Sequence, residues 1–335
     1  MYAPKKIVND PRNVVDELLE GMTLAGDGRL KQISGGRGII RTDLPPDRVA
    51  VLIGGGSGHE PVFHGFVGPG MGDGAACGNI FAAPAPNIVF DVAQAIHRGR
   101  GVLFVYGNYA GDIMNFDMAA ELCEEEGIEV QTVRVWDDIT SAPPSEMDKR
   151  RGVAGDLLVI KMAGAAARTF DTLEEVAAAT ARGRDAIRSI GVAVRAGSIP
   201  ETGHPTFELG DDEIEIGMGA HGEPGVERTK LMPADPLVDN MMDRLFADLP
   251  LAKGDKVALV LNDLGSTTMM ELYIVNRRVR QILDARGIEV YRTEAGRFVA
   301  CQEMAGFSIT LMKLDEELAG YLDQPVDSLG YRRLG

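Results

Sequence analysis

The chain has 335 residues, of which 45% are hydrophobic and 25% are charged, and its formal net charge is −16. This length exceeds what one hydrophobic core usually serves, so two domains are expected. The acidic balance argues against nucleic acid and anionic membranes as partners, because both require clustered Lys and Arg. No run of about 18 apolar residues occurs, so no membrane span is expected.

The N-terminus and the cysteines indicate a cytoplasmic protein. The first ten residues, M-Y-A-P-K-K-I-V-N-D, contain no apolar stretch of signal-peptide length. The three cysteines lie far apart and form no C-x-x-C pair. This spacing is typical of reduced thiols rather than of disulfides or a zinc site, so we expect no bound metal.

Strand-like and helix-like segments alternate through the first half of the chain, which predicts a doubly wound, mostly parallel α/β sheet. Helices are predicted at 11–25, 88–99, 113–126, 154–167 and 172–190, and strands at 38–41, 49–53, 101–106 and 129–135. Residues 62–87 are glycine-rich and show no period, so we expect a long ordered loop.

The pattern changes near residue 191. A mixed sheet with helices is predicted from strands at 192–196, 213–218, 257–261, 289–292 and 307–314, a helix ending near 286 and a terminal helix. We therefore expect two α/β domains. Residues 1–190 form the N-terminal domain with glycine loops, and residues 191–335 form the C-terminal domain.

Three glycine-bearing loops carry polar groups directly after strands. The sequence V-A-V-L-I-G-G-G-S-G-H-E-P at 49–61 places Ser57 and His59 at the carboxyl end of a buried strand, where α/β sheets bind ligands. We expect its glycines to turn the backbone sharply and leave room for a ligand. Asp112 follows the next strand, where a helix N-cap would also explain it. His221 lies in a loop of the second domain. A cleft between the domains would bring His59, Asp112 and His221 together.

These residues fit the common catalytic motifs poorly. Two histidines and a carboxylate lack the spacing of a known metal site. Ser57 is not embedded in G-x-S-x-G, which argues against a serine hydrolase. No Walker motif G-x-x-x-x-G-K-[ST] occurs, so we do not expect the chain to bind ATP by itself.

Longer motifs carry a specific resemblance. G-G-G-S-G-H-E-P at 54–61, N-Y-A-G-D at 108–112 and G-x-H-G-E-P-G at 219–225 resemble the DhaK family, the substrate-binding subunits of dihydroxyacetone kinases. K-M-A-G-A-A-A at 161–167 and N-D-L-G-S-T at 262–267 are similar to further landmarks of that family. The motifs occur in the family order through almost the whole chain.

The resemblance implies a role for each matching residue. His221 would bond to the ketone carbon of a short ketose as a hemiaminal, a bond that glycerol cannot form. His59 would hydrogen-bond the substrate oxygen, and Asp112 would accept the proton of the terminal hydroxyl as it attacks phosphorus. Gly56 would offer a backbone contact to a substrate hydroxyl.

The resemblance also implies partners. Phosphoryl transfer depends mainly on positioning and charge neutralisation, so ATP or ADP and Mg²⁺ are expected on a separate DhaL-like subunit, recharged by ATP or by a phosphotransferase-system protein. This chain would bind no cofactor. A homodimer acting in glycerol or rarer sugar metabolism is also implied.

Two motifs depart from the family pattern at four positions. Typical members read K-N-Y-T-G-D and F-T-S-P, whereas this chain has Gly107 and Ala110 in place of the lysine and threonine of the first motif, and Ala82 and Ala83 in place of the threonine and serine of the second. With Ser57 and Gly58, Gly107 and Ala83 are expected to line the substrate. The losses enlarge the pocket, which favours a four- or five-carbon ketose such as erythrulose beside or instead of dihydroxyacetone.

The main alternative is a non-catalytic paralogue that senses the ketone and acts as a co-regulator. His221 suits either role, whereas Asp112 favours the enzyme, because only chemistry needs a base there. A metal-dependent hydrolase is a weaker third interpretation.

Overall fold

The computed structural model describes residues 5–219 and 221–334. Part of the N-terminal segment used for the signal-peptide prediction and residue 220 of the predicted histidine loop therefore lie outside the described residues. The chain forms two compact units, each containing a six-stranded sheet. Unit 1 comprises the chain up to residue 135, residues 156–183 and the chain from residue 320. Unit 2 comprises residues 136–155 and 184–319.

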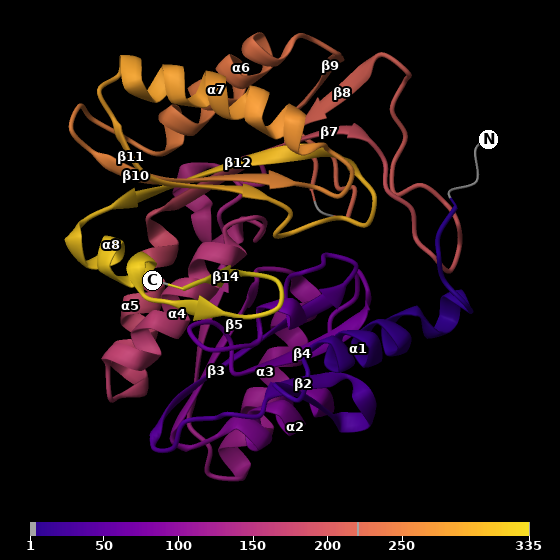
Figure 1. The fold of residues 1–335 in the computed structure, drawn as a ribbon, viewed down its shortest axis with the longest axis vertical. Coiled ribbons are helices and arrows are strands. Elements are labelled where there is room, and N and C mark those ends of the chain that lie inside the picture. Colours follow the sequence, from indigo (N-terminus) through magenta and orange to yellow (C-terminus); the bar gives the residue numbers. More distant parts are fainter. Residues whose placement is uncertain (1–4, 220, 335) are drawn as a thin grey trace. The chain divides into compact units, whose positions relative to one another are not determined.

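The sheet of unit 1 has the strand order β1-β2-β4-β3-β5-β6. Its strands β4, β3, β5 and β6 pair in parallel, and β1 and β2 extend the sheet antiparallel at one edge. The elements, labelled in Figure 1 where there is room, are α1 (Val14–Ala25), β1 (Leu30–Ile33), β2 (Gly38–Arg41), β3 (Arg48–Ser57), β4 (Gly74–Ile80), α2 (Pro86–Ile96), β5 (Gly99–Gly107), α3 (Ala110–Glu125), β6 (Val130–Val135), α4 (Asp156–Thr169), most of α5 (Leu173–Asp185), the end of α8 (Glu316–Asp323), β13 (Val326–Asp327) and β14 (Arg332–Arg333).

Both faces of this sheet are covered. Leu52 and Phe104 contribute to a core shared with α2 and α3. Val51 and Val105 alternate with them on the same strands and are equally buried, and α4 contacts β3 and β5. Strands that are apolar on both faces require helices on both faces. The prediction of a doubly wound, mostly parallel sheet is confirmed.

One strand lies where the sequence predicted only an ordered loop. Within residues 62–87, β4 pairs with both β2 and β3. Its small residues let α2 approach closely, since a Cβ on Gly74 would lie 2.8 Å from the Val92 side chain. The prediction was wrong here because a strand of glycine and alanine lacks the large apolar residues that signal strands.

The sheet of unit 2 has the strand order β11-β10-β12-β7-β8-β9. Only β10 and β11 pair in parallel among its described strands, so the predicted mixed sheet is confirmed. Its main elements are β7 (Ile187–Arg195), β8 (Glu213–Ile216), β9 (Glu227–Lys230), α6 (Ala234–Asp248), β10 (Lys256–Asp263), α7 (Met269–Ala285), β11 (Glu289–Gly296) and β12 (Ala305–Leu314).

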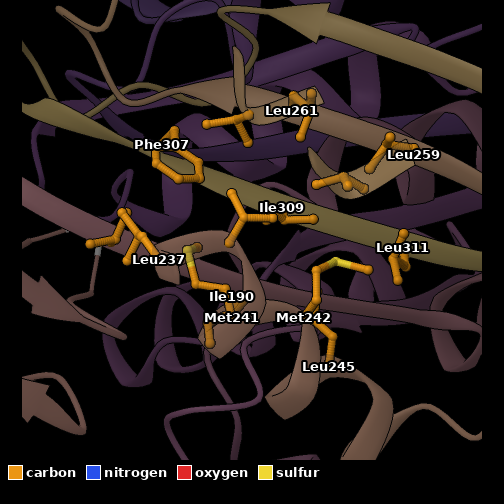
Figure 2. Close-up of a cluster of buried hydrophobic side chains, with 14 of the residues drawn as sticks. Ile190, Leu237, Met241, Met242, Leu245, Leu259, Leu261, Phe307, Ile309 and Leu311 are labelled. Carbon is orange, nitrogen blue, oxygen red and sulfur yellow. The ribbon is translucent and has the colours of Figure 1, made fainter. Parts of the chain in front are cut away.

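A hydrophobic core joins the sheet of unit 2 to α6 and α7. Figure 2 shows Ile309 of β12 and Leu261 of β10 in the same cluster as Met241 and Met242 of α6, and all four are fully buried. Burying such side chains contributes roughly 1.5–3 kcal/mol each. This core fixes the strands of unit 2, and the strands in turn position the loops at their ends.

The compact units divide the chain differently from the predicted domains, 1–190 and 191–335. The predicted boundary falls inside β7, which pairs with β12 and β8 within the sheet of unit 2. In addition, residues 136–155 belong to unit 2 although they precede two helices of unit 1. The sequence pattern locates strands and helices but does not show which sheet an interleaved segment joins.

Candidate functional site

The glycines after the predicted buried strand are part of the strand itself. β3 continues to Ser57, and Gly54 and Gly55 pair with β4. A Cβ on Gly54 would lie 2.6 Å from the backbone oxygen of Ala76, and one on Gly55 would lie 2.3 Å from the Phe63 ring. The expected sharp turn at these glycines was therefore wrong: they permit close packing, and the first positive φ comes at Gly58, at +100°.

β3 ends at a structural residue, Ser57, and the loop after it contains a buried histidine. The hydroxyl of Ser57 donates a hydrogen bond to the backbone oxygen of Gly78 at 2.8 Å, and the residue is fully buried. The ring of His59 lies against Phe81, with ring centroids 4.8 Å apart, and is 6% exposed. The N–H of Gly58 donates to Glu60 at 2.8 Å. His59 is therefore buried, with its ring against Phe81.

The residues after β4 reach the other predicted site residues of unit 1. A Cβ on Gly56 would lie 2.8 Å from the backbone nitrogen of Ala82. A Cβ on Gly111 would lie 3.6 Å from the Cβ of Ala83. Asn115 of α3 donates to the backbone oxygen of Pro84 at 2.9 Å. The structure thus brings the end of β3, the loop at 81–84 and the start of α3 together.

Asp112 lies in the first turn of α3. The helix begins at Ala110 with Tyr109 as its N-cap, so the interpretation of Asp112 as the N-cap was wrong. Gly107 is the buried last residue of β5, and the N–H of Asn108 donates to the backbone oxygen of Val135 at 2.9 Å. A helix N-terminus stabilises negative charge, which suits a carboxylate at this position.

The loop between β8 and β9 carries His221 and is held by hydrogen bonds between its own residues. The N–H of Gly219 donates to the backbone oxygen of Glu223 at 2.9 Å, and that of Gly222 donates to Gly219 at 3.1 Å. The N–H of Gly225 donates to the Glu215 carboxylate of β8 at 2.6 Å. Gly222 has φ +89°, which favours glycine. These hydrogen bonds stabilise the conformation of the loop that carries the histidine.

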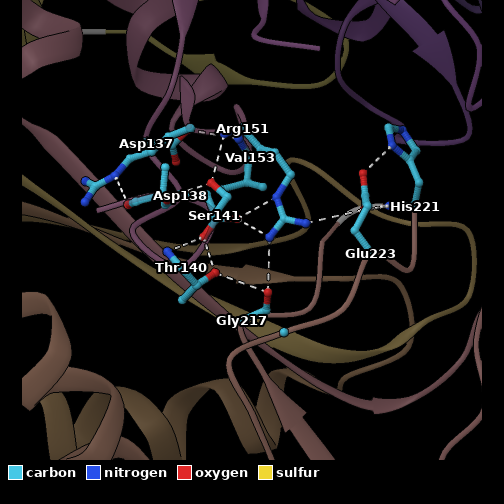
Figure 3. A network of polar contacts seen from close by, with 12 residues as sticks. Asp137, Asp138, Thr140, Ser141, Arg151, Val153, Gly217, His221 and Glu223 are labelled. Atoms are coloured by element: carbon cyan, nitrogen blue, oxygen red, sulfur yellow. Dashed lines mark hydrogen bonds and ion pairs between the residues drawn. The ribbon is translucent and has the colours of Figure 1, made fainter. Parts of the chain in front are cut away.

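Glu223 is a site residue that the sequence reasoning missed, although it lies only two positions after His221. Its Oε2 accepts the backbone N–H of His221 at 2.9 Å, and its Oε1 lies 3.3 Å from Nδ1 of the same residue. Figure 3 shows the two side chains side by side. The His221 side chain is 27% exposed. It therefore combines a fixed ring nitrogen with access from solvent.

The charge of Glu223 determines which nitrogen of the ring carries hydrogen. Burial alone would raise the pKa of this carboxyl, but the hydrogen bond and charge of His221 outweigh burial and lower the pKa to about 2. At neutral pH the carboxylate can only accept hydrogen bonds. Nδ1 of His221 must then be the donor, so Nε2 is the unprotonated nitrogen when the ring is neutral.

The motif at 262–267 has a structural role within unit 2. The Asn262 amide donates to Val299 at 2.8 Å and accepts from two backbone N–H groups, and the residue is fully buried. Asp263 accepts the N–H of Gly265 at 2.7 Å and pairs with Arg297 at 2.8 Å. These contacts fix the end of β10 and explain the motif without a ligand.

Other predicted features can be compared with the described chain. Cys77, Cys123 and Cys301 are free thiols buried in the fold. Within residues 5–219 and 221–334, no group of three His, Cys, Asp or Glu side chains lies where it could hold a metal ion. No described helix is long and apolar enough to cross a membrane.

Comparisons with known proteins place the chain in one family. The Dak1 domain model matches residues 20–330. The dihydroxyacetone-binding subunit DhaK of PTS-dependent dihydroxyacetone kinase 1 from Listeria innocua is 41% identical over 328 residues, which cover 98% of this chain and 100% of that protein. An L-erythrulose 1-kinase from Mycolicibacterium smegmatis is 40% identical over 333 residues, 98% of this chain and 58% of its own length.

Two solved structures are also similar over nearly the whole chain. The dihydroxyacetone kinase from C. freundii in complex with AMP-PNP and Mg²⁺ matches with a TM-score of 0.91 at 31% identity, covering 98% of this chain and 61% of that one. The dihydroxyacetone kinase operon co-activator Dha-DhaQ matches with a TM-score of 0.87 at 30% identity, covering 94% and 97%. The similar proteins thus include kinases and a co-activator.

Proposed function

This chain belongs to the Dak1 domain family, and on that premise we propose that it is the ketose-binding subunit of a dihydroxyacetone-type kinase. The full-length similarity to a dihydroxyacetone-binding subunit supports this assignment. The equally similar L-erythrulose 1-kinase widens the substrate class to short ketoses in general. The observation that carries the proposal is the His221–Glu223 pair, because it presents a nucleophilic nitrogen.

His221 captures the ketone. The lone pair of Nε2 adds to the carbonyl carbon, the C=O π bond becomes a C–O single bond, and the oxygen takes up a proton from solvent to give the hemiaminal. The ring gains positive charge as the bond forms. The Glu223 carboxylate, 3.3 Å from Nδ1, stabilises that charge.

Asp112 acts as the base in phosphoryl transfer, and His59 orients the substrate. As the terminal hydroxyl oxygen of the ketose attacks phosphorus, Asp112 accepts its proton. His59 hydrogen-bonds a substrate oxygen, and its buried contact with Phe81 limits the movement of the ring. Gly56, Ser57 and Gly58 contribute backbone contacts beside it.

The phosphoryl donor belongs to a separate DhaL-like subunit that carries ATP or ADP with Mg²⁺. This chain contains no Walker motif, and phosphoryl transfer requires a bound metal and nucleotide somewhere in the complex. Recharging of the donor by ATP or by a phosphotransferase-system protein stays a prediction, as do the homodimer, the cytoplasmic location and the role in glycerol or rarer sugar metabolism.

The substrate is a short ketose for which Gly107 and Ala83 provide space. Ala83 packs against the start of α3, next to Asp112. A lysine and a serine at these two positions would add a cation and a hydroxyl. Without them, a four- or five-carbon ketose such as erythrulose fits the enlarged pocket, with or without activity toward dihydroxyacetone.

A reconstituted assay tests the proposed function. The chain is mixed with a DhaL-like subunit, a phosphoryl donor and Mg²⁺, and phosphorylation of dihydroxyacetone, erythrulose, a pentulose and glycerol is measured. We expect ketose phosphorylation only when both proteins are present, and none of glycerol. Phosphorylation of glycerol at a comparable rate would contradict capture through a carbonyl group.

A non-catalytic co-regulator is the second candidate, supported by the 30% identity to the co-activator Dha-DhaQ over 94% of this chain. A sensor would bind the ketone through His221 but would not need a base at Asp112. If ketose binds and no DhaL-like subunit yields product under any donor, this alternative replaces the kinase subunit.

A further inference from the structure

Arg151 lies between two carboxylates of unit 2, one of which is Glu223. Its Nε and Nη2 lie 3.0 and 2.8 Å from Oδ2 of Asp138, and Nη2 donates to the backbone oxygen of Gly217 at 3.3 Å. Its Nη1 lies 3.8 Å from Oε2 of Glu223. The Arg151 side chain is 14% exposed. Figure 3 shows this guanidinium between the Asp138 loop and the His221 loop.

Asp138 fixes the position of Arg151. Its carboxylate is almost completely buried and accepts the N–H of Thr140 at 3.0 Å and the hydroxyl of Thr140 at 2.6 Å, besides the contacts from Arg151. Arg151 balances the charge of Asp138, and its planar fork still directs Nη1 toward Glu223. The guanidinium thus acts as a rigid support rather than as a mobile surface charge.

Gly219 allows the ion pair to form. A Cβ at this position would lie 2.2 Å from Oε2 of Glu223 and 2.4 Å from Nη1 of Arg151. Both atoms therefore occupy the space that any other residue would need. The first glycine of the G-x-H-G-E-P-G motif is explained by the approach of these two charged groups to the backbone.

We propose that Arg151 is a positioning residue for ketone capture: it holds Oε2 of Glu223, so that Oε1 faces Nδ1 of His221 and Nε2 is the unprotonated nitrogen that attacks. The proposal rests on the proposed function of His221. Oε2 contacts both Arg151 and the backbone N–H of His221. Without Arg151, only the two contacts with His221 itself hold the carboxylate, one to each oxygen, so the Glu223 side chain gains freedom to change rotamer.

Two variants of the full chain test this role. Arg151→Gln removes the charge and Arg151→Lys keeps it without the planar fork. Arg278→Gln is the control, since Arg278 in the same unit pairs with Asp239 at 2.7 Å and contacts Gln281, and neither partner lies in the His221 loop. Binding of dihydroxyacetone and of L-erythrulose is measured by calorimetry. The ring nitrogens of His221 are read by ¹⁵N NMR and assigned with His221→Asn.

For Arg151→Gln we expect about fivefold weaker ketose binding, the upper range for a partly exposed ion pair. The ¹⁵N signals of His221 should move from a single Nδ1–H form to a mixture of tautomers. Arg151→Lys should restore part of both effects, and Arg278→Gln should change neither. If Arg151→Gln does not fold, Gly219→Ala replaces it, and it should weaken binding in the same direction.

The outcomes separate the two proposals. If the wild-type chain binds neither ketose, capture by His221 is contradicted and the role of Arg151 in capture falls with it, whatever the NMR signals show. If the wild type binds ketose while Arg151→Gln binds as tightly with unchanged ring signals, the Arg151 role is overturned and the proposed function stands. An equal loss in Arg278→Gln would show a general structural effect and would also overturn it.

Discussion

Glu223 contacts His221 through both of its carboxylate oxygens: Oε2 accepts the backbone N–H at 2.9 Å, and Oε1 lies 3.3 Å from Nδ1. A residue two positions away thus fixes both the backbone and the ring of the histidine. This geometry gives the ketone-capture proposal its chemical basis, because an acceptor at Nδ1 leaves Nε2 unprotonated in the neutral ring. It also predicts how stability depends on pH.

The contribution of Glu223 to stability should vanish in acid. The contacts with His221 lower the folded-state pKa of Glu223 from an ordinary 4.5 to about 2. The folded state therefore binds fewer protons than the unfolded state between these values, so stability from this group is fully present above about pH 4.5 and is lost as the pH falls toward 2. The difference in melting temperature between wild type and Glu223→Gln should be largest near neutral pH and should shrink from pH 5 to pH 3. A constant difference would contradict the ionised pairing.

Asp112→Asn should abolish turnover while leaving ketose binding intact. A positioned base contributes about a hundredfold or more, and the amide keeps the size of the side chain. Phosphorylation in the reconstituted assay and ketose binding by calorimetry are measured side by side. Asp117→Asn, on an exposed position of the same helix, is the matched control and should keep full turnover. Turnover that survives in Asp112→Asn would show that Asp112 is not the base.

Much of the fold could be predicted from hydrophobic patterns in the single sequence. The buried strands β3, β5 and β10 were predicted because their long apolar runs have few other interpretations. β4 was missed because its residues are small glycines and alanines, which let α2 pack closely against the strand. This packing depends on a contact between separate elements, so it leaves no hydrophobic pattern in the local sequence. The interleaving of the two units was missed for the same reason, since it depends on contacts between distant segments.

The resemblance to the DhaK family, which rested on octapeptide-length motifs, is confirmed by the domain match and by full-length relatives. The prediction of a kinase-type phosphotransferase is confirmed at the level of the family, because relatives spanning this chain are kinases or kinase subunits. The individual roles of His221, Asp112 and His59 stay predictions. Glu223 and Arg151 could not be singled out from sequence, because their importance lies in side-chain distances.

The glycines of β3 should tolerate no Cβ. Gly54→Ala would place a methyl carbon 2.6 Å from a backbone oxygen and 2.9 Å from the Phe116 ring, and such overpacking costs about 1–3 kcal/mol. Gly320→Ala in α8 is the control, because no atom lies within 4 Å of its Cβ position, and alanine favours the helix by about 1 kcal/mol. Urea unfolding should show the two changes moving stability in opposite directions. An unchanged midpoint in Gly54→Ala would contradict the packing role.

Ala83→Ser should shift substrate preference toward dihydroxyacetone. The new hydroxyl restores a donor found in typical family members and occupies space beside the start of α3, where Ala83 faces Gly111. We expect the ratio of kcat/KM for dihydroxyacetone over erythrulose to rise about tenfold, the usual effect of one well-placed hydrogen bond of about 1.4 kcal/mol. Ala82→Ser, at the exposed neighbouring position, is the control. If the ratio of kcat/KM does not change in Ala83→Ser, residue 83 does not determine substrate specificity.

Covalent binding of the keto carbon by His221 can be seen in a crystal structure of the chain with dihydroxyacetone or L-erythrulose. We predict continuous density from Nε2 of His221 to a tetrahedral carbon at single-bond distance, about 1.5 Å, with Nδ1 still facing Glu223. An occupied pocket with a planar, unbonded ketone beyond van der Waals contact of Nε2 would contradict it.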